Sequence, residues 1–182
     1  MTLREFILRY PIASNKEEIE RQIQCLPRPS TLGGKIIPDT LNEASMGEIM
    51  ALKRAINING TDIDKIKNSA MVLGIVVDES EESAEAFFGF GFWIARELER
   101  IAKLFNTTSI EPTEEEKQAG VERVNHGDFG LIDWFARRMG IANHEEAEKV
   151  PWVRYYMCLK IDADNARYER ELRKVYNNKH KR

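Results

Sequence analysis

The sequence predicts a mainly α-helical protein, folded as a multi-helix bundle. Two observations lead to this class: helix-start signatures recur along the chain, and apolar residues repeat at steps of three and four. The composition agrees, because 42% hydrophobic residues in a chain of 182 suffice for a core. We expect two long helices, over about 81–105 and 151–176, an extended Pro/Gly arm, and a segment at 71–77 whose pattern fits either a short strand or a helix.

The helix-start signature is the capping box, in which Ser, Thr, Asp or Asn is followed three residues later by Glu. The two side chains bond backbone N–H groups that the first turn of a helix leaves free. The pattern occurs at Thr2/Glu5, Ser14/Glu17, Ser45/Glu48, Asp78/Glu81, Thr113/Glu116 and Asn143/Glu146. We therefore expect helices to begin near these six positions.

The first 44 residues divide into two parts. Apolar residues at helical spacing, each series ended by a proline, predict an N-terminal helical pair over 1–26. Three prolines and two glycines then fall within 27–38, which indicates an extended arm or linker over 27–44. The remainder, 45–182, is expected to be a helical body with a basic C-terminal tail.

The apolar pattern of residues 63–77 fits two structures. Steps of three and four from Ile63 to Val77 suit the core face of a helix. Gly74 interrupts that pattern, and the β-branched run Ile75–Val77 favours a strand over 71–77. Both interpretations remain open from the sequence.

The longest helical pattern runs from Ala84 to Phe105 in steps of three and four. Two glycines within it, Gly89 and Gly91, disfavour a helix by about 1 kcal/mol each. Close approach of a neighbouring helix would compensate for that cost. Four aromatic residues surround the glycines and pack either the core or a subunit interface: Phe87, Phe88, Phe92 and Trp93.

The last long helix begins at Pro151, a residue favoured in the first turn, and its end is basic. Residues 167–182 hold seven Lys or Arg against two acids. Such an end suits a solvated tail or an arm that docks onto a neighbour. With the Pro/Gly arm it supplies the other candidate interface residues: Pro27, Arg28, Pro29, Arg170, Arg173, Lys174, Lys179, Lys181 and Arg182.

The sequence carries no motif for catalysis, metal binding or a cofactor. The three histidines have no helical ligand spacing, and Cys25 and Cys158 lie in no motif. A net charge of −3 argues against a protein that coats nucleic acid through charge alone. The longest apolar run, 70–77, is too short to span a membrane. We expect a non-enzyme with no catalytic residue, no metal, no cofactor and no membrane partner.

One segment allows a second interpretation. Residues 129–150 resemble a degenerate helix-turn-helix, with Gly140 at the turn. The reading helix would be 143–150, which has three glutamates and one lysine. A reading helix approaches phosphates and base edges, usually with Arg, Lys, Asn or Gln. Nucleic acid is therefore a less favoured partner, and a helical DNA-binding or regulatory protein stays an alternative function.

The C-terminal third carries a pattern of residue types shared with a group of viral proteins. Glu114–Gly120, Gly127–Gly140 and the segment from Val150 to Tyr176 resemble small all-α morphogenesis proteins of tailed bacteriophages. Some of those proteins are head–tail ring or adaptor components, and others are tail-assembly chaperones. The resemblance, over about residues 110–176, implies a non-enzymatic structural role in the virion after synthesis in the host cytoplasm.

That resemblance orders the functional hypotheses. The first is a ring or adaptor component of the head–tail or tail region that acts through helix packing and docking arms. Its partners would be further copies of itself and neighbouring assembly proteins. The alternative within the same group is a tail-assembly chaperone that is absent from the mature particle.

Overall fold

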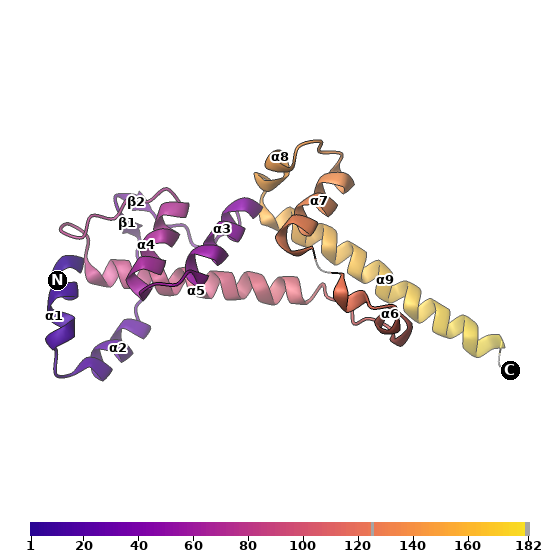
Figure 1. Cartoon of the computed structure of the whole chain (residues 1–182), viewed down its shortest axis with the longest axis horizontal. Coiled ribbons are helices and arrows are strands. Elements are labelled where there is room, and N and C mark those ends of the chain that lie inside the picture. The colour runs from indigo at the N-terminus through magenta and orange to yellow at the C-terminus, as the bar shows by residue number, and fades with distance from the viewer. Residues whose placement is uncertain (125, 181–182) are drawn as a thin grey trace. The chain divides into compact units, whose positions relative to one another are not determined.

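The structure, a computed structural model, describes residues 1–124 and 126–180. These residues form nine α-helices, two short 3-10 helices and one two-stranded sheet (Figure 1). The prediction of a mainly helical fold is confirmed. The chain divides into two compact units, each described by itself: unit 1 comprises Met1–Leu41 and Gly47–Arg100, and unit 2 comprises Asn42–Met46 and the chain from Ile101 onward. The predicted N-terminal helical pair (1–26) and residues 27–41 of the predicted Pro/Gly segment both belong to unit 1, whereas residues 42–44 of that segment belong to unit 2.

Unit 1 begins with two short helices joined by a 3-10 turn. Helix α1 (Leu3–Arg9) starts at a capping box, in which the Glu5 N–H donates to Thr2 Oγ1 at 3.2 Å and the Thr2 N–H to the Glu5 carboxylate at 3.1 Å. After η1 (Tyr10–Ile12), helix α2 (Lys16–Gln24) begins at Asn15 without a side-chain cap. Leu3 and Phe6 are buried, whereas α2 has no buried residue.

The segment expected as an extended arm is a β-hairpin. Strands β1 (Thr31–Leu32) and β2 (Lys35–Ile36) pair antiparallel around Gly33 and Gly34, which both have positive φ. Two successive positive φ angles are the geometry of a tight hairpin turn, which favours glycine. Leu32 and Ile37 are each only 1% exposed. The burial of these two side chains anchors the segment in the core of unit 1. The proline and glycine content of the segment gave no indication of this burial.

Helices α3 (Met46–Asn57) and α4 (Asp62–Val72) follow, and no strand occurs over 71–77. Gly74, at φ +66°, ends the α4 region with a left-handed residue, and the chain continues without regular structure. Ile75 is buried while Val76 is 83% exposed. The strand alternative is therefore wrong: the β-branched run is a connection in which Ile75 contributes to the core.

Helix α5 (Ala84–Asn106) is the first of the two predicted long helices. It begins after Ser83, whose hydroxyl accepts from the Ala86 N–H at 3.0 Å, and not at Asp78. The Asp78 carboxylate instead accepts from the Ser80 N–H at 2.8 Å, in a turn before the helix. In Figure 1 the other elements of unit 1 gather along the first part of α5.

A buried carboxylate fastens the end of the hairpin segment to α5. Glu97 is 8% exposed and accepts from the Leu41 N–H and from Arg100 Nη2, each at 2.8 Å. The hydrogen bond from Arg100 lowers the pKa of this carboxyl, and burial opposes the shift. The charge is therefore paired and belongs to the structure of unit 1.

Unit 2 contains α6 (Glu114–Gln118), η2 (Val121–Arg123), α7 (Gly127–Met139), α8 (His144–Glu148) and α9 (Trp152–His180). Its core lies between α7 and the first turns of α9, where the rings of Phe135 and Tyr155 stack at 3.7 Å. The Tyr155 hydroxyl donates to the Ala147 carbonyl at 2.7 Å and so holds α8. The second predicted long helix is confirmed as α9.

A short piece of chain from before α3 also belongs to unit 2. The Met46 N–H donates to the Val150 carbonyl at 2.9 Å, and the Trp152 N–H donates to the Ala44 carbonyl at 3.1 Å. These bonds form an isolated antiparallel bridge between Ser45 and Pro151. The segment Asn42–Met46 thus satisfies backbone groups at the start of α9.

Candidate functional site

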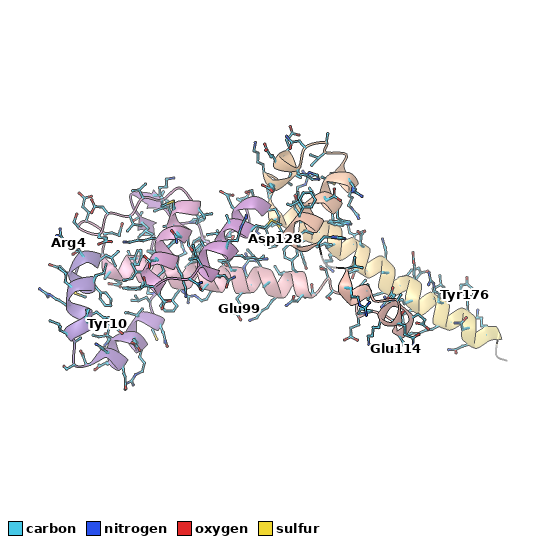
Figure 2. The ribbon with its side chains drawn as sticks, viewed as in Figure 1. Arg4, Tyr10, Glu99, Glu114, Asp128 and Tyr176 are labelled. Carbon is cyan, nitrogen blue, oxygen red and sulfur yellow. The ribbon has the colours of Figure 1, made fainter. Side chains whose placement is uncertain are left out.

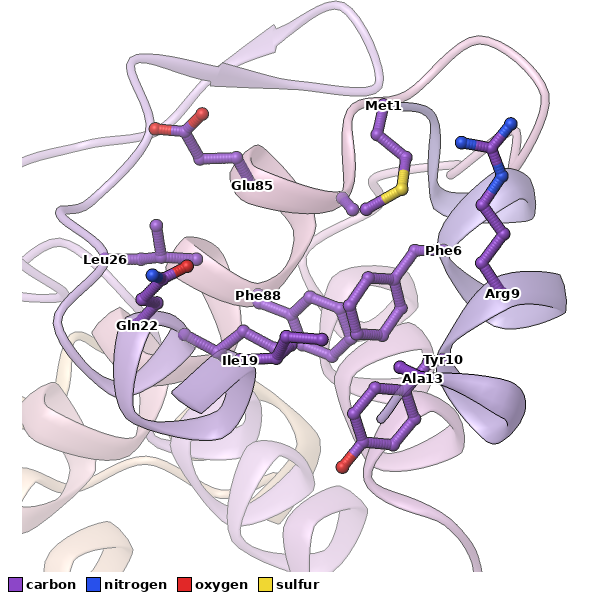
Figure 3. A pocket seen from close by; sticks show the side chains of 12 residues that line it. Met1, Phe6, Arg9, Tyr10, Ala13, Ile19, Gln22, Leu26, Glu85 and Phe88 are labelled. Carbon is purple, nitrogen blue, oxygen red and sulfur yellow. The ribbon is translucent and has the colours of Figure 1, made fainter. Parts of the chain in front are cut away.

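Two adjoining hollows of unit 1 border α2 and are here together named the α2 groove. One hollow has a volume of about 700 Å³ and is lined by α2, α4 and α5. The other, of about 350 Å³, is lined by α1, α2 and the first turn of α5 (Figure 3). Both hollows share Phe6, Tyr10, Ile23 and Phe88. Together they form one apolar site within unit 1.

Helix α2 is tied to unit 1 at its middle and just beyond its C-terminal end, and no residue of it is buried. The Tyr10 hydroxyl donates to the Glu20 carboxylate, and Arg96 Nη2 donates to the Leu26 carbonyl at 3.4 Å. Ile19 and Ile23 face the hollows and stay half-exposed. A nine-residue helix with two apolar contacts leaves space beneath it.

Aromatic rings form the floor of the groove. The Phe6 ring meets Phe88 edge-on at 4.9 Å and stacks on Tyr10 at 5.2 Å. Figure 3 shows Phe6 and Phe88 side by side at the centre, with Arg9 at the edge. Phe92, half-buried, continues the floor into the larger hollow. Such a surface binds apolar side chains through burial and ring contacts.

Charged residues of both signs border this apolar floor: Arg9, Glu20, Asp62, Lys65 and Glu85. Lys65 Nζ lies 3.4 Å from the Asp62 carboxylate. The hydrogen bond to Glu20 raises the pKa of Tyr10, with smaller contributions from desolvation and from the Glu20 charge. Across the described residues, no three His, Cys, Asp or Glu side chains gather as a metal site would require. The groove therefore has an apolar floor with charged residues of both signs at its border.

The four aromatic residues singled out in the sequence separate into two pairs. Phe87 and Trp93, at 0% and 5% exposure, belong to the core of unit 1, and Trp93 Nε1 donates to the Asp39 carbonyl at 3.3 Å. Phe88, at 8% exposure, and the half-buried Phe92 line the α2 groove. Phe88 and Phe92 therefore border the groove, whereas Phe87 and Trp93 pack within their own unit.

The three residues of the Pro/Gly segment are fastened to unit 1. Arg28 donates to the Ile37 carbonyl and pairs with Asp39. The carbonyl of Pro27 and the ring of Pro29 lie against Gly89 of α5. These residues position the hairpin and stand apart from the groove lining.

The basic residues of α9 also separate. Arg170 donates to the Glu111 carbonyl at 2.7 Å and reaches Glu116 at 3.3 Å, which fixes the loop before α6. Lys174 pairs with Glu171 at 2.7 Å along the helix. Arg173 and Lys179 are exposed. The last two predicted interface residues, Lys181 and Arg182, lie outside the described residues.

Sequence reasoning missed the groove residues on the short helices. Tyr10, Ile23, Ile63 and Ile66 line it beside the predicted aromatics. Each sits at helical spacing and has the same pattern as a core residue. Only the sparse packing of α2, a tertiary property, distinguishes them.

Within the described parts of the chain, no helix is both long and apolar enough to cross a membrane. Comparison of the chain with protein-family models, with curated proteins and with solved structures finds no match.

Proposed function

We propose that this chain is a non-enzymatic assembly protein of a tailed bacteriophage particle, acting as a ring or adaptor component of the head–tail or tail region. The observation that supports it best is the α2 groove, an apolar, ring-lined site that is open to solvent. Grooves of this kind receive the apolar face of a helix from another chain. The viral setting rests on the resemblance of residues 110–176 to phage morphogenesis proteins.

In this function the groove supplies contact energy. A Leu or Phe side chain of a neighbouring subunit would bury against Phe6, Phe88 and Phe92, and each such burial contributes about 1.5–3 kcal/mol. Few anchors suffice in a repeated assembly, because every closed contact raises the effective concentration of the next. Hot-spot residues of protein interfaces are typically aromatic side chains in pockets like this one.

The second candidate is a tail-assembly chaperone that leaves before the particle is complete. The packing of α2 favours it, because a helix without a buried residue can move aside and return with little loss of contact. A DNA-binding function gains less support. Helix α8, the would-be reader, has five residues and includes Glu145, Glu146 and Glu148.

The test is a mass measurement in solution, alone and after co-expression with the products of the neighbouring genes. We expect a defined high-order complex for the natural chain, and its loss when a charge enters the groove, as in Ile23→Glu or Phe92→Glu. The matched control is Val76→Glu, which alters a side chain of unit 1 that is 83% exposed and outside the groove. Thermal unfolding checks that each variant is folded.

The same experiment separates the candidates. A ring or adaptor component remains with purified particles, whereas a chaperone is found only with unassembled proteins. Folded groove variants that assemble as well as the natural chain would contradict the proposal. Salt-dependent DNA binding by a lone monomer would favour the regulatory alternative.

A further inference from the structure

Helix α9 in unit 2 has two apolar faces, and only one of them is buried. Trp152, Tyr155 and Ala163, each at most 2% exposed, face the core of the unit. Successive residues of a helix are rotated by 100°, so Ile161 points away from Ala163 by about 200°. Ile161 is 50% exposed and belongs to a second row of large apolar side chains: Met157, Ile161, Tyr168, Leu172, Val175 and Tyr176. We name this row the second α9 face.

The row has the spacing of a helix-pairing seam. Its members from Met157 to Val175 follow one another at steps of 4, 7, 4 and 3, which keeps them on one side of the helix. From Met157 to Tyr176 the face extends about 28 Å at 1.5 Å per residue. All six side chains are at least 36% exposed. Figure 2 shows Tyr176 near the C-terminal end of this helix. Continuous exposure of this kind, in contrast to scattered apolar residues, marks an interaction surface.

Acidic residues border the face on both sides. Asp162 and Glu169 lie about 80–100° to one side of Ile161, and Asp164 and Glu171 lie about 60–80° to the other. Asp162 pairs with Arg138, Asp164 with Lys160 and Arg167, and Glu171 with Lys174. Such exposed pairs are weak and leave the acids accessible to a further cation.

The basic residues of the same helix lie mostly elsewhere. Arg167 donates to the carbonyls of Thr107 and Ser109, and Arg170 donates to the carbonyl of Glu111. These two side chains hold the loop on the far side of α9. Arg173 lies about 120° from Ile161, farther than the acids, whereas Lys160 lies about 100° away, as far as Asp162. Arg154 and Lys179 continue the line of the row just beyond its two ends. The second α9 face is thus an apolar row between two acidic rows.

This charge pattern identifies the occupant. Two copies of α9 packed face to face would bring the acidic rows of one against those of the other, and like charges beside a seam oppose pairing. We propose that the second α9 face docks an amphipathic helix from a different protein, with Lys or Arg residues on both sides of its own apolar seam. Asn165, which lies within the seam and is exposed, favours a polar residue opposite it and so helps fix the register.

The test uses two synthetic helical peptides of three heptads with the same Leu/Ile seam. One carries Lys at the flanking positions and the other carries Glu, and both are titrated by fluorescence anisotropy against the full chain. We expect the Lys peptide to bind at least tenfold more tightly than the Glu peptide. Raising the salt concentration should reduce this difference.

Variants then locate the site. Tyr168→Ala with Leu172→Ala removes apolar contacts without a change of charge and should weaken the Lys peptide at least tenfold. Asn177→Ala, on the opposite and exposed side of α9, is the matched control and should bind normally. Glu169→Lys with Glu171→Lys should shift the preference toward the Glu peptide. Circular dichroism of each variant confirms that α9 is intact.

Several results would overturn the proposal. Equal binding of both peptides would show that the acidic rows do not select the partner, and binding of neither would show that the face docks no such helix. A natural chain that is dimeric, and becomes monomeric in the Tyr168→Ala/Leu172→Ala variant, would assign the face to a second copy. Each result is independent of the α2 groove, which lies in unit 1.

Discussion

At Gly89 and Gly91 of α5, the absence of a side chain allows two different neighbours to approach. A Cβ atom added at Gly89 would lie 2.4 Å from the carbonyl oxygen of Pro27, a backbone atom. At Gly91 it would meet the end of the Ile66 side chain at 2.6 Å. The sequence predicted close approach of a neighbouring helix at both. That holds for Gly91, which faces α4, whereas Gly89 faces the start of the hairpin segment.

We predict that an alanine is tolerated at position 91 and destabilises the protein at position 89. Gly89→Ala should lower the free energy of unfolding by about 1–3 kcal/mol, because the Pro27 carbonyl is fixed and the overlap forces backbone movement. Gly91→Ala should stay within about 1 kcal/mol of the natural chain, since the gain in helix propensity offsets the movement of Ile66. Urea unfolding measures both. Equal losses would contradict the assignment of the Gly89 contact to backbone.

Tyr155 links pH to the stability of unit 2. Its side chain is 0% exposed, and burial, with a smaller contribution from Glu148, raises its pKa from 10.0 to about 12. The phenol of Tyr155 has a pKa near 10 in the unfolded chain and near 12 in the folded chain. The contribution of Tyr155 to the free energy of unfolding is therefore complete below pH 10 and is lost as the pH rises through 12. The loss amounts to about 3 kcal/mol, since one pKa unit is about 1.4 kcal/mol.

The Tyr155→Phe variant separates the hydrogen bond of the Tyr155 hydroxyl from its ionisation. At pH 7 the variant should be less stable by about 1 kcal/mol, because the Ala147 carbonyl loses its donor. Between pH 10 and 12 the natural chain should lose more stability than the variant, so their difference shrinks or reverses. Thermal unfolding at several pH values follows both. Tyr176→Phe, at an exposed position, is the control and should parallel the natural chain at every pH.

Among the elements, the loop between α5 and α6 depends on two arginines of α9. Arg167 Nη2 donates to the Thr107 carbonyl at 2.6 Å, and Arg170 Nη1 donates to the Glu111 carbonyl at 2.7 Å. The basic character of this stretch of helix was visible in the sequence, where it suggested a solvated tail or a docking arm. The structure assigns these two side chains to unit 2 itself.

Arg167→Ala combined with Arg170→Ala should free this loop. We expect roughly tenfold faster hydrogen exchange and protease cleavage within residues 107–113, because hydrogen bonds of about 0.5–1.5 kcal/mol each are removed. Arg173→Ala, an exposed position on the same helix, should leave the loop unchanged. Similar acceleration in that control would show that the effect comes from a general loss of helix stability.

Element starts illustrate what local sequence can and cannot specify. The boxes at Thr2/Glu5 and Thr113/Glu116 form as predicted. Those at Ser14/Glu17 and Asp78/Glu81 do not, since α2 begins at Asn15 without a side-chain cap and the Asp78 carboxylate accepts from the Ser80 N–H in a turn. A third box uses Asp64 with Thr61, a pair that a search for Glu passes over. The hairpin escaped prediction since its stability comes from burial of Leu32 and Ile37, which depends on distant parts of unit 1. The α2 groove could not be predicted either, because it depends on how α2 packs against distant parts of unit 1.

For the whole molecule, the two proposed docking surfaces lie in different units and should act independently. We predict that Ile23→Glu, in the α2 groove, leaves binding of the Lys peptide to the second α9 face unchanged. Conversely, Tyr168→Ala with Leu172→Ala should leave the groove-dependent complex intact. Paired measurements of peptide affinity and complex mass on the same preparations check this. A folded variant that loses both activities would show that the two surfaces serve one interaction.

The position of Asn42–Met46 in unit 2 determines how the C-terminal unit can be expressed as a separate fragment. They precede most of unit 1 in the sequence, yet their backbone bonds close the junction between α8 and α9. A C-terminal fragment cut at residue 101 would therefore expose the Trp152 N–H and the Val150 carbonyl, beside the ring cluster of that unit. Expression of the C-terminal unit alone calls for a rearranged gene in which these five residues are rejoined to it by a linker.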